Sequence, residues 1–186
     1  QDSTFSSTNG LVCNYYFGTY RPYKQRWGND PIGYSSNGFT LASECNDAVI
    51  NSFDNLVCNW NGSRFAPYRI SDEEMIGYSS YGYDYPSECI DAVASNRNQF
   101  VCQWNGYRFQ PHDVKTDTSI GFSNDGFVGK LECNQAVRGS RGDLICSEWS
   151  EDYAVFNRKL SKIWPTNSRR FLNLQECIDY IESDLY

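Results

Sequence analysis

The chain has 186 residues, of which 40% are hydrophobic and 16% aromatic, which is enough to bury a core and excludes an intrinsically disordered chain. Its net charge of −7 and isoelectric point of about 4.7 argue against nucleic acid as a partner, because phosphate binding needs clustered Lys and Arg. No apolar run approaches the roughly 18 residues that cross a bilayer, so we expect no membrane insertion.

The chain opens on a Ser/Thr-rich stretch, and we expect residues 1–10 to form a flexible N-terminal tail. It starts at Gln1, without Met and without an apolar targeting segment. We therefore interpret it as the mature form of a secreted, extracellular protein.

Eight cysteines then follow with a fixed rhythm, at successive gaps of 32, 13, 31, 13, 31, 13 and 31 residues. Each first cysteine follows two apolar residues, and each second cysteine follows a glutamate. Such self-similarity indicates internal repeats. We expect one compact domain of four repeats, at 11–55, 56–99, 100–143 and 144–186.

The second repeat shows the secondary structure that we expect in each. Residues 56–60 and 64–70 have the composition of strands, and Asn61-Gly62 between them favours a two-residue hairpin turn with positive φ at both positions. A third short strand is expected at 75–79.

A short helix follows, with Ser87 as the expected N-cap and Glu88 in the first turn, where a negative charge suits the helix dipole. Cys89, Ala92 and Val93 fall on one helical face. Each repeat is therefore expected to be β-β-β-α, and the fold class mainly β with one short helix per repeat.

One such repeat cannot bury both of its faces, whereas four together can. We expect a pseudo-fourfold, propeller-like arrangement, with a compact linear stack or two packed pairs as alternatives. The fourth repeat diverges, because it carries Trp164-Pro165 in place of the Ile-Gly-aromatic step and a basic stretch with Arg158, Lys159 and Lys162. It is either a cap or a specialised site.

The even cysteine count and the secreted context argue for disulfides. Two pairing schemes treat all repeats alike, one joining the cysteines within each repeat and one joining each helix to the next strand. We favour the first, because it attaches each helix to its own sheet. The predicted pairs are Cys13–Cys45, Cys58–Cys89, Cys102–Cys133 and Cys146–Cys177. Zinc is not expected, since no cysteines are closely spaced and there is one histidine.

Aromatic and arginine side chains are the best candidates for ligand binding, since they combine flat contact area with polar reach. Packing between repeats or within the core is the competing interpretation for each, and His112 in particular occupies an aromatic position of the repeat. The candidates are Trp60, Arg64, Tyr68, Tyr78, Tyr83, Trp104, Arg108 and His112.

Other motifs carry weaker signals. We predict no catalytic residue, because helix capping explains the repeated glutamates better than a catalytic carboxylate pair. No cofactor is expected; calcium at Asp72, Glu73 and Glu74 is the weaker alternative to a solvated acidic loop, because no EF-hand spacing is present. The tripeptide 141–143 is Arg-Gly-Asp and could act in adhesion.

The leading functional hypothesis is a secreted, multivalent, lectin-like carbohydrate-binding protein, because four similar repeats offer up to four similar sites. The alternative is a protein-binding module, such as a protease inhibitor, an adhesin or a surface-assembly subunit. An enzyme that degrades an extracellular polymer is a third hypothesis. The expected partner is thus an extracellular glycan or protein.

Overall fold

A computed structural model describes residues 9–25, 30–34, 37–121, 124–163 and 169–183. The chain divides into two compact units, Gln1–Ala94 and Ser95–Tyr186, here called unit 1 and unit 2. Each unit contains two of the expected repeats, and each is described by itself. Whether the whole chain forms one compact domain stays a prediction.

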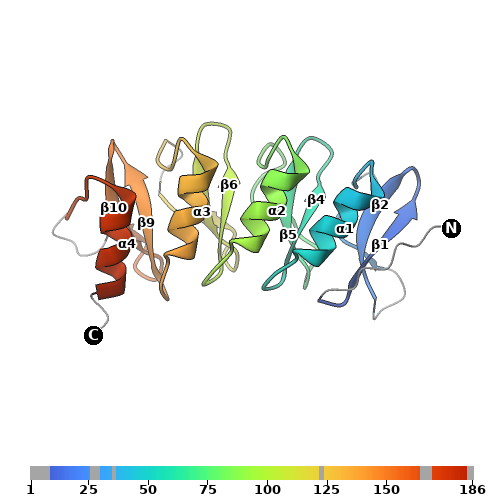
Figure 1. Ribbon diagram of the computed structural model, residues 1–186, viewed down its shortest axis with the longest axis horizontal. Coiled ribbons are helices and arrows are strands. Elements are labelled where there is room, and N and C mark those ends of the chain that lie inside the picture. The colour runs from blue at the N-terminus through green and yellow to red at the C-terminus, as the bar shows by residue number, and fades with distance from the viewer. Residues whose placement is uncertain (1–8, 26–29, 35–36, 122–123, 164–168, 184–186) are drawn as a thin grey trace. The chain divides into compact units, whose positions relative to one another are not determined.

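Unit 1 contains one three-stranded and one two-stranded antiparallel sheet, each followed by a helix. The helices lie side by side on one face of the sheets (Figure 1), and α1 contacts strands of both. The elements are β1 (Leu11–Tyr16), β2 (Thr19–Lys24), β3 (Asp30–Pro31), α1 (Ala42–Ile50), β4 (Leu56–Trp60), β5 (Phe65–Arg69) and α2 (Pro86–Ala94).

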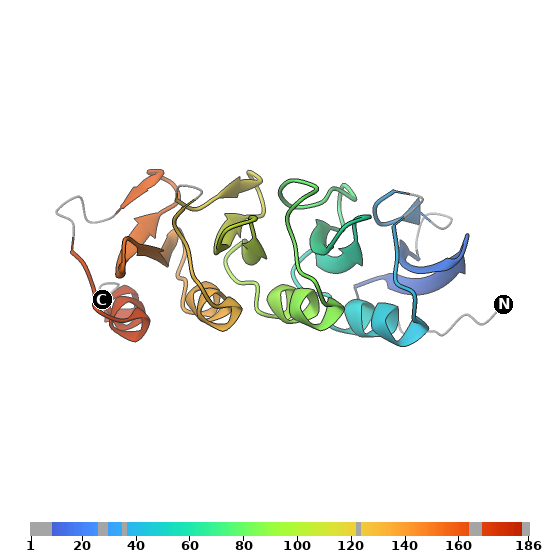
Figure 2. The same ribbon diagram turned by 90° about the horizontal axis from the view of Figure 1, so that it is seen from above.

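Unit 2 repeats this plan with two three-stranded sheets. Figure 2 shows its two helices on the same side of their sheets, and α3 contacts strands of both repeats. The elements are β6 (Phe100–Trp104), β7 (Phe109–Asp113), β8 (Thr118–Ser119), α3 (Lys130–Arg138), β9 (Leu144–Trp149), β10 (Asp152–Asn157), β11 (Lys162–Ile163) and α4 (Leu174–Ser183).

The mainly β fold class and the repeat are confirmed, and so is the pairing of cysteines within each repeat. A propeller is not confirmed, because no sheet in the described ranges closes or continues from one repeat into the next. The third strand is reduced to two residues in three repeats, and in the second repeat to a single bridge between Tyr68 and Met75.

The hairpin turn predicted at Asn61-Gly62 is wrong in detail. Residues 61–64 form a four-residue loop in which the Oδ1 of Asn61 accepts the backbone N–H of Ser63 (2.9 Å) and of Arg64 (2.8 Å). Gly62 alone in this loop has positive φ, at 100°. The asparagine acts through its side chain, as such turn residues often do, rather than through a left-handed backbone.

Left-handed pairs occur instead where the chain enters the first strand of a repeat. Asp54 and Asn55 have φ of 48° and 69°, and Asn98 and Gln99 have φ of 51° and 64°. These pairs match the two-residue turn that suits the twist of a hairpin. These turns could not be predicted from the sequence, because neither pair contains the glycine that is typical of a two-residue hairpin turn.

The N-cap predicted at Ser87 is also wrong, because α2 begins at Pro86 and places Ser87 inside its first turn. Leu41 and Gly129 precede α1 and α3 and make no side-chain cap bond. The prediction of a glutamate in the first turn is confirmed in all four helices, where its charge compensates the unpaired N–H groups. These residues are Glu44, Glu88, Glu132 and Glu176.

In the first three repeats a glycine and an aromatic residue join the end of the loop to the hairpin of the same repeat, whereas the fourth repeat has Arg170 in place of the glycine. In the third repeat Phe127 is fully buried and exchanges backbone hydrogen bonds with Phe109 (2.8 and 2.9 Å). A Cβ on Gly126 would lie 2.8 Å from the backbone oxygen of Phe109, and its φ is 110°. Both the approach and the backbone conformation require glycine there.

The two repeats of unit 2 share one core. Its cluster of buried residues includes Phe100 and Val137 from the third repeat, and Ile145 and Ile178 from the fourth. The prediction that a repeat cannot bury its faces alone thus agrees with the packing inside unit 2. Among the described residues, no helix is both long enough and apolar enough to span a membrane.

The expected N-terminal tail lies largely outside the described residues, as does Trp164-Pro165. Asn9, at the end of that tail, belongs to the fold. Its Nδ2 donates to the backbone oxygen (2.9 Å) and the Oγ (3.1 Å) of Ser52 in the loop after α1. Contacts with the first repeat therefore begin at Asn9, two residues before its expected start at Leu11.

Candidate functional site

Three of the candidate binding residues lie in the interior and not at the surface. Tyr68, Tyr83 and His112 are each 2% exposed. Burial raises the pKa of Tyr68 to about 12, although Asn37 donates a hydrogen bond to its hydroxyl (3.1 Å) and opposes the rise. Burial also lowers the pKa of His112 to about 4, so this imidazole is neutral at neutral pH. Their packing role agrees with the competing interpretation.

The two candidate tryptophans, Trp60 and Trp104, are half-buried. They are therefore neither core residues nor fully exposed surfaces on which a ligand could stack. The ring of Trp60 lies 4.9 Å from that of Phe65, and the ring of Trp104 lies 5.0 Å from that of Phe109. In each pair the partner is the first residue of the return strand. The tryptophans therefore cover the hairpin ends.

Tyr78 and Arg64 lie at the surface of unit 1. Tyr78 is 73% exposed and meets Tyr81 edge to face at 5.3 Å. Arg64 donates from Nη1 to Asp84 Oδ1 at 2.5 Å. Both remain accessible, and neither lies in a described cleft.

Arg108 is half-buried near two carboxylates of unit 2. Burial raises the pKa of Glu148, and the charge of Glu132 adds to the rise, whereas Arg108 lowers it. Glu148 stands one residue after the buried Ser147, in β9. Glu148 therefore combines a raised pKa with a second carboxylate, Glu132, close by. The enzyme hypothesis would depend on such a pair of carboxylates.

The acidic loop considered for calcium is engaged with cations of the chain itself. Asp72 accepts hydrogen bonds from Arg69 Nε (2.9 and 3.1 Å), and Glu73 forms an ion pair with Lys24 at 2.5 Å. Within the described residues, no three His, Cys, Asp or Glu side chains are grouped so as to hold a metal ion.

The Arg-Gly-Asp tripeptide is held by the fold at both charged ends. Arg141 donates from Nη1 to the backbone oxygen of Glu182 (3.2 Å). Asp143 accepts from Arg158 Nη2 at 2.8 Å. An adhesion receptor would have to compete with Arg158 for the carboxylate of Asp143, so the geometry does not favour the adhesion interpretation.

The described cleft with the most binding character lies in unit 2, between the third and fourth repeats. It has a volume of about 760 Å³, within the range typical of small-ligand sites. Its apolar part comes from Ile120 in the third repeat and from Trp149, Phe156 and Ile163 in the fourth. The guanidinium of Arg170 lies 5.2 Å from the centre of the Trp149 ring.

Hydroxyl groups from both repeats also line the cleft, together with the charged side chains of Asp113, Arg158 and Lys162. The hydroxyls belong to Thr116, Thr118, Ser119 and Ser161, and all four residues are exposed. Hydroxyls both donate and accept hydrogen bonds, so a cleft lined by them can bind a ligand that itself carries many hydroxyls.

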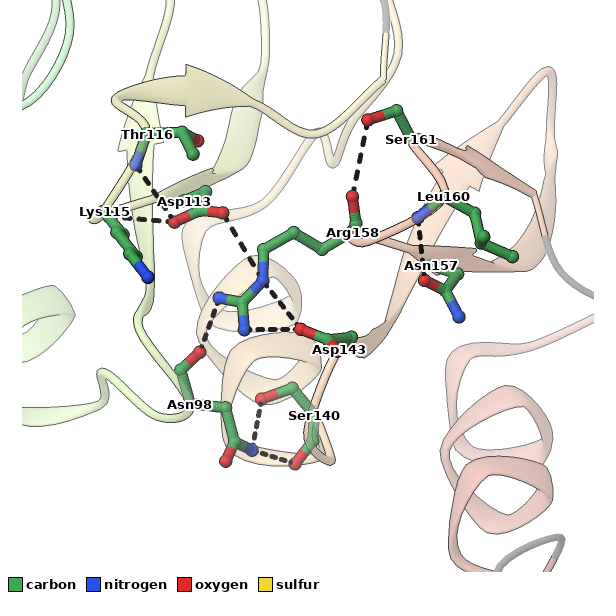
Figure 3. Close-up of polar contacts among 10 residues, drawn as sticks. All are labelled: Asn98, Asp113, Lys115, Thr116, Ser140, Asp143, Asn157, Arg158, Leu160 and Ser161. Carbon is green, nitrogen blue, oxygen red and sulfur yellow. Dashed lines mark hydrogen bonds and ion pairs between the residues drawn. The ribbon is translucent and has the colours of Figure 1, made fainter.

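Arg158, which lines the cleft together with Asp113, is the centre of a polar network (Figure 3). Its Nε lies 3.4 Å from Asp113 Oδ2 and its Nη2 lies 2.8 Å from Asp143 Oδ1. Its Nη1 donates to the backbone oxygen of Asn98 at 2.9 Å. The guanidinium also lies 4.6 Å from the centre of the Phe100 ring. One side chain of the fourth repeat thus binds three polar groups and a ring around the junction with the third.

Asp113 shares its two oxygens between its own turn and this arginine. Oδ1 accepts the backbone N–H of Lys115 (2.8 Å) and of Thr116 (3.3 Å), and Oδ2 faces Arg158. With 3% of its side chain exposed, this carboxylate depends on the arginine for charge compensation. Lys162, which also lines the cleft, forms no ion pair with another described residue.

An ion pair also links the two repeats of unit 1 at the corresponding position, but the cation and the anion have exchanged repeats. Lys24 occupies the position of Asp113, and its Nζ donates to Glu73 Oε1 (2.5 Å) and to the backbone oxygen of Ser71 (3.2 Å). In unit 1 the cation thus comes from the earlier repeat, and in unit 2 from the later one.

The sequence signalled this site only in part. The basic stretch of the fourth repeat pointed to Arg158 and Lys162, and to a specialised role for that repeat. Trp149 was missed, because it aligns with Asn61 and Asn105, which form turns in the second and third repeats. An alignment of the repeats on their first cysteines shows that tryptophan replaces asparagine at this position in the fourth repeat.

Comparison with protein-family models, with curated proteins and with solved structures finds no match. The functional argument therefore rests on the geometry of unit 2 and on the residues that line its cleft.

Proposed function

We propose that this is a secreted carbohydrate-binding protein and that the cleft of unit 2 is a saccharide site. The observation that carries the proposal is the lining, in which the indole of Trp149 stands among hydroxyl side chains from two repeats. Aromatic rings stack on the apolar faces of sugars, and hydroxyl and charged groups hydrogen-bond their edges. Secretion is supported by the four disulfides, which form and persist in oxidising compartments.

The proposal commits to one site in unit 2. Trp149 has no tryptophan counterpart at the aligned positions of the other repeats, which hold Tyr16, Asn61 and Asn105. The fourth repeat is then a specialised site rather than a plain cap. Further sites on the other repeats, as multivalent binding would require, stay a prediction that binding stoichiometry would test.

A glycan array probed with the intact protein, followed by calorimetry on the best ligand, tests the proposal. We expect Trp149→Ala to weaken binding by roughly tenfold, the equivalent of about 1.4 kcal/mol, because the stacking surface is lost. Thr118→Val should weaken it less, through one hydroxyl. Trp104→Ala is the matched control, since Trp104 is also half-buried and does not line the cleft.

Circular dichroism and the absence of free thiols would establish that each variant folds. Lack of binding to a broad array of neutral and acidic glycans would overturn the proposal. So would an equal loss of affinity in Trp149→Ala and Trp104→Ala, because the cleft would then have no special part in binding.

A protein-binding function is the second candidate, and the hairpin of the first repeat favours it. Tyr15, Tyr16 and Phe17 are 59%, 52% and 80% exposed at its tip. Exposed aromatic groups of this kind often dominate protein interfaces. Inhibition of a panel of secreted proteases, abolished by Phe17→Ser, would support this candidate over the first.

A further inference from the structure

A second described pocket of unit 2, with a volume of about 650 Å³, is lined by three arginines. Arg97 precedes β6, Arg138 ends α3, and Arg141 precedes β9. Asp179 and Glu182 of α4 also line it. In a chain with a net charge of −7, the three arginines and two carboxylates of this pocket give it a net charge of about +1.

Each of these arginines is positioned by one hydrogen bond to a neutral group. Arg97 donates to the backbone oxygen of Arg138 (3.0 Å), and Arg138 donates to the Oγ of Ser95 (2.8 Å). Arg141 donates to the backbone oxygen of Glu182 (3.2 Å). A guanidinium has five N–H donors, so each arginine keeps donors for a ligand. Among the described residues, none of the three forms an ion pair.

The fold does not require arginine at these positions, as unit 1 demonstrates. Ile50 and Phe53 align with Arg138 and Arg141, and are 51% and 54% exposed. The scaffold beneath is the same in both units. Asn98 Nδ2 donates to the backbone oxygen (2.8 Å) and the Oγ (3.2 Å) of Ser140, shown in Figure 3, as Asn9 does to Ser52. Backbone structure therefore does not explain the arginines.

The three arginines exceed the two carboxylates of the same pocket by one positive charge, and a bound anion would offset that excess. Guanidinium groups bind planar or tetrahedral oxyanions through paired, charge-assisted hydrogen bonds. We propose that Arg97, Arg138 and Arg141 bind the sulfate or carboxylate group of an acidic saccharide. The carboxylates of Asp179 and Glu182 accept hydrogen bonds from the neighbouring sugar hydroxyls and disfavour densely charged polyanions.

This site is separate from the cleft that contains Trp149, so it does not rest on the proposed function. Calorimetry with the intact protein at low and at physiological salt would test it. The probes are an oligosaccharide with one sulfate per disaccharide, its desulfated counterpart, and inorganic sulfate and phosphate. Tighter binding of the sulfated than of the desulfated form is expected, and inorganic sulfate should compete. If inorganic sulfate alone binds as tightly as the oligosaccharide, the saccharide part of the proposal is overturned.

The variant Arg138→Ile/Arg141→Phe copies the residues that unit 1 uses and should therefore fold. We expect it to bind the sulfated probe roughly tenfold more weakly, because two charge-assisted contacts are lost. Arg64→Gln removes an arginine of unit 1 and should change binding less than about twofold. Equal losses of affinity in both variants would mean that overall charge, and not this pocket, determines binding, and would overturn the proposal. Absence of binding by the unmodified protein would also overturn it.

Discussion

Replacing Arg158 by Met tests whether the network in Figure 3 stabilises the junction of the third and fourth repeats. The substitution removes the guanidinium and keeps most of the apolar stem. It leaves the carboxylate of Asp113, 3% exposed, without the cation that faces it at 3.4 Å. It also takes the donor from the backbone oxygen of Asn98.

Breaking a buried ion pair by removing one partner costs about 3–5 kcal/mol. The side chain of Arg158 is 21% exposed, so some water reaches the pair and the low end, about 3 kcal/mol, is expected. Its contact with Asp143 adds little, because that carboxylate is 43% exposed and surface pairs contribute about 0–1 kcal/mol. Lys24→Met is the matched control in unit 1, where the side chains of the pair are 20% and 36% exposed and a loss below about 1 kcal/mol is expected.

Urea unfolding with intact disulfides gives the free energies of unfolding, and hydrogen exchange in β7 and β10 reports on unit 2 separately. A double-mutant cycle with Asp113→Asn isolates the pair, and its coupling energy should be most of the loss. A loss below about 1 kcal/mol for Arg158→Met, or one equal to that of Lys24→Met, would refute the reasoning.

Two further predictions concern single residues. Gly126→Ala should lower the free energy of unfolding by roughly 3 kcal/mol, because its Cβ would meet the backbone oxygen of Phe109 at 2.8 Å and its φ is 110°. Gly106→Ala, with φ of 99° and nothing within 4 Å, should cost about 1 kcal/mol in urea unfolding, and equal losses would contradict the steric argument. Because burial lowers the pKa of His112 from 6.5 to about 4, stability should be full above pH 6.5. It should fall by about 1.4 kcal/mol per pH unit between pH 6.5 and 4, where the unfolded chain alone binds the proton. His112→Phe should remove this slope above pH 5, and an unchanged slope would exclude the histidine as its cause.

The disulfides could be predicted because their spacing is a local and repeated property. Cys58 lies in a strand predicted at its observed bounds, and Cys89, Ala92 and Val93 were placed on the buried helix face. Backbone periodicity decides both features within a few residues. Turn geometry was less predictable, because the side chain of Asn61 competes with its backbone as the source of the turn.

Surface and interior could not be told apart for the aromatic candidates. Tyr68 and Tyr78 look alike in the sequence, yet one is 2% exposed and the other 73%. A strand has two faces, and burial of each depends on what packs against it from another repeat. For Tyr68 this includes Asn37, which is 31 residues away in the chain.

The order of residues thus determined the repeat, its strands and helix, and the cysteine partners, since each depends on spacings within about 44 residues. The tertiary structure decided the rest. Arg158 faces Asp113, and Trp149 shares a cleft with Thr118, because two repeats of unit 2 fold against one core. Contacts between repeats leave no periodic trace in the sequence, and such contacts create both of the sites proposed for this protein.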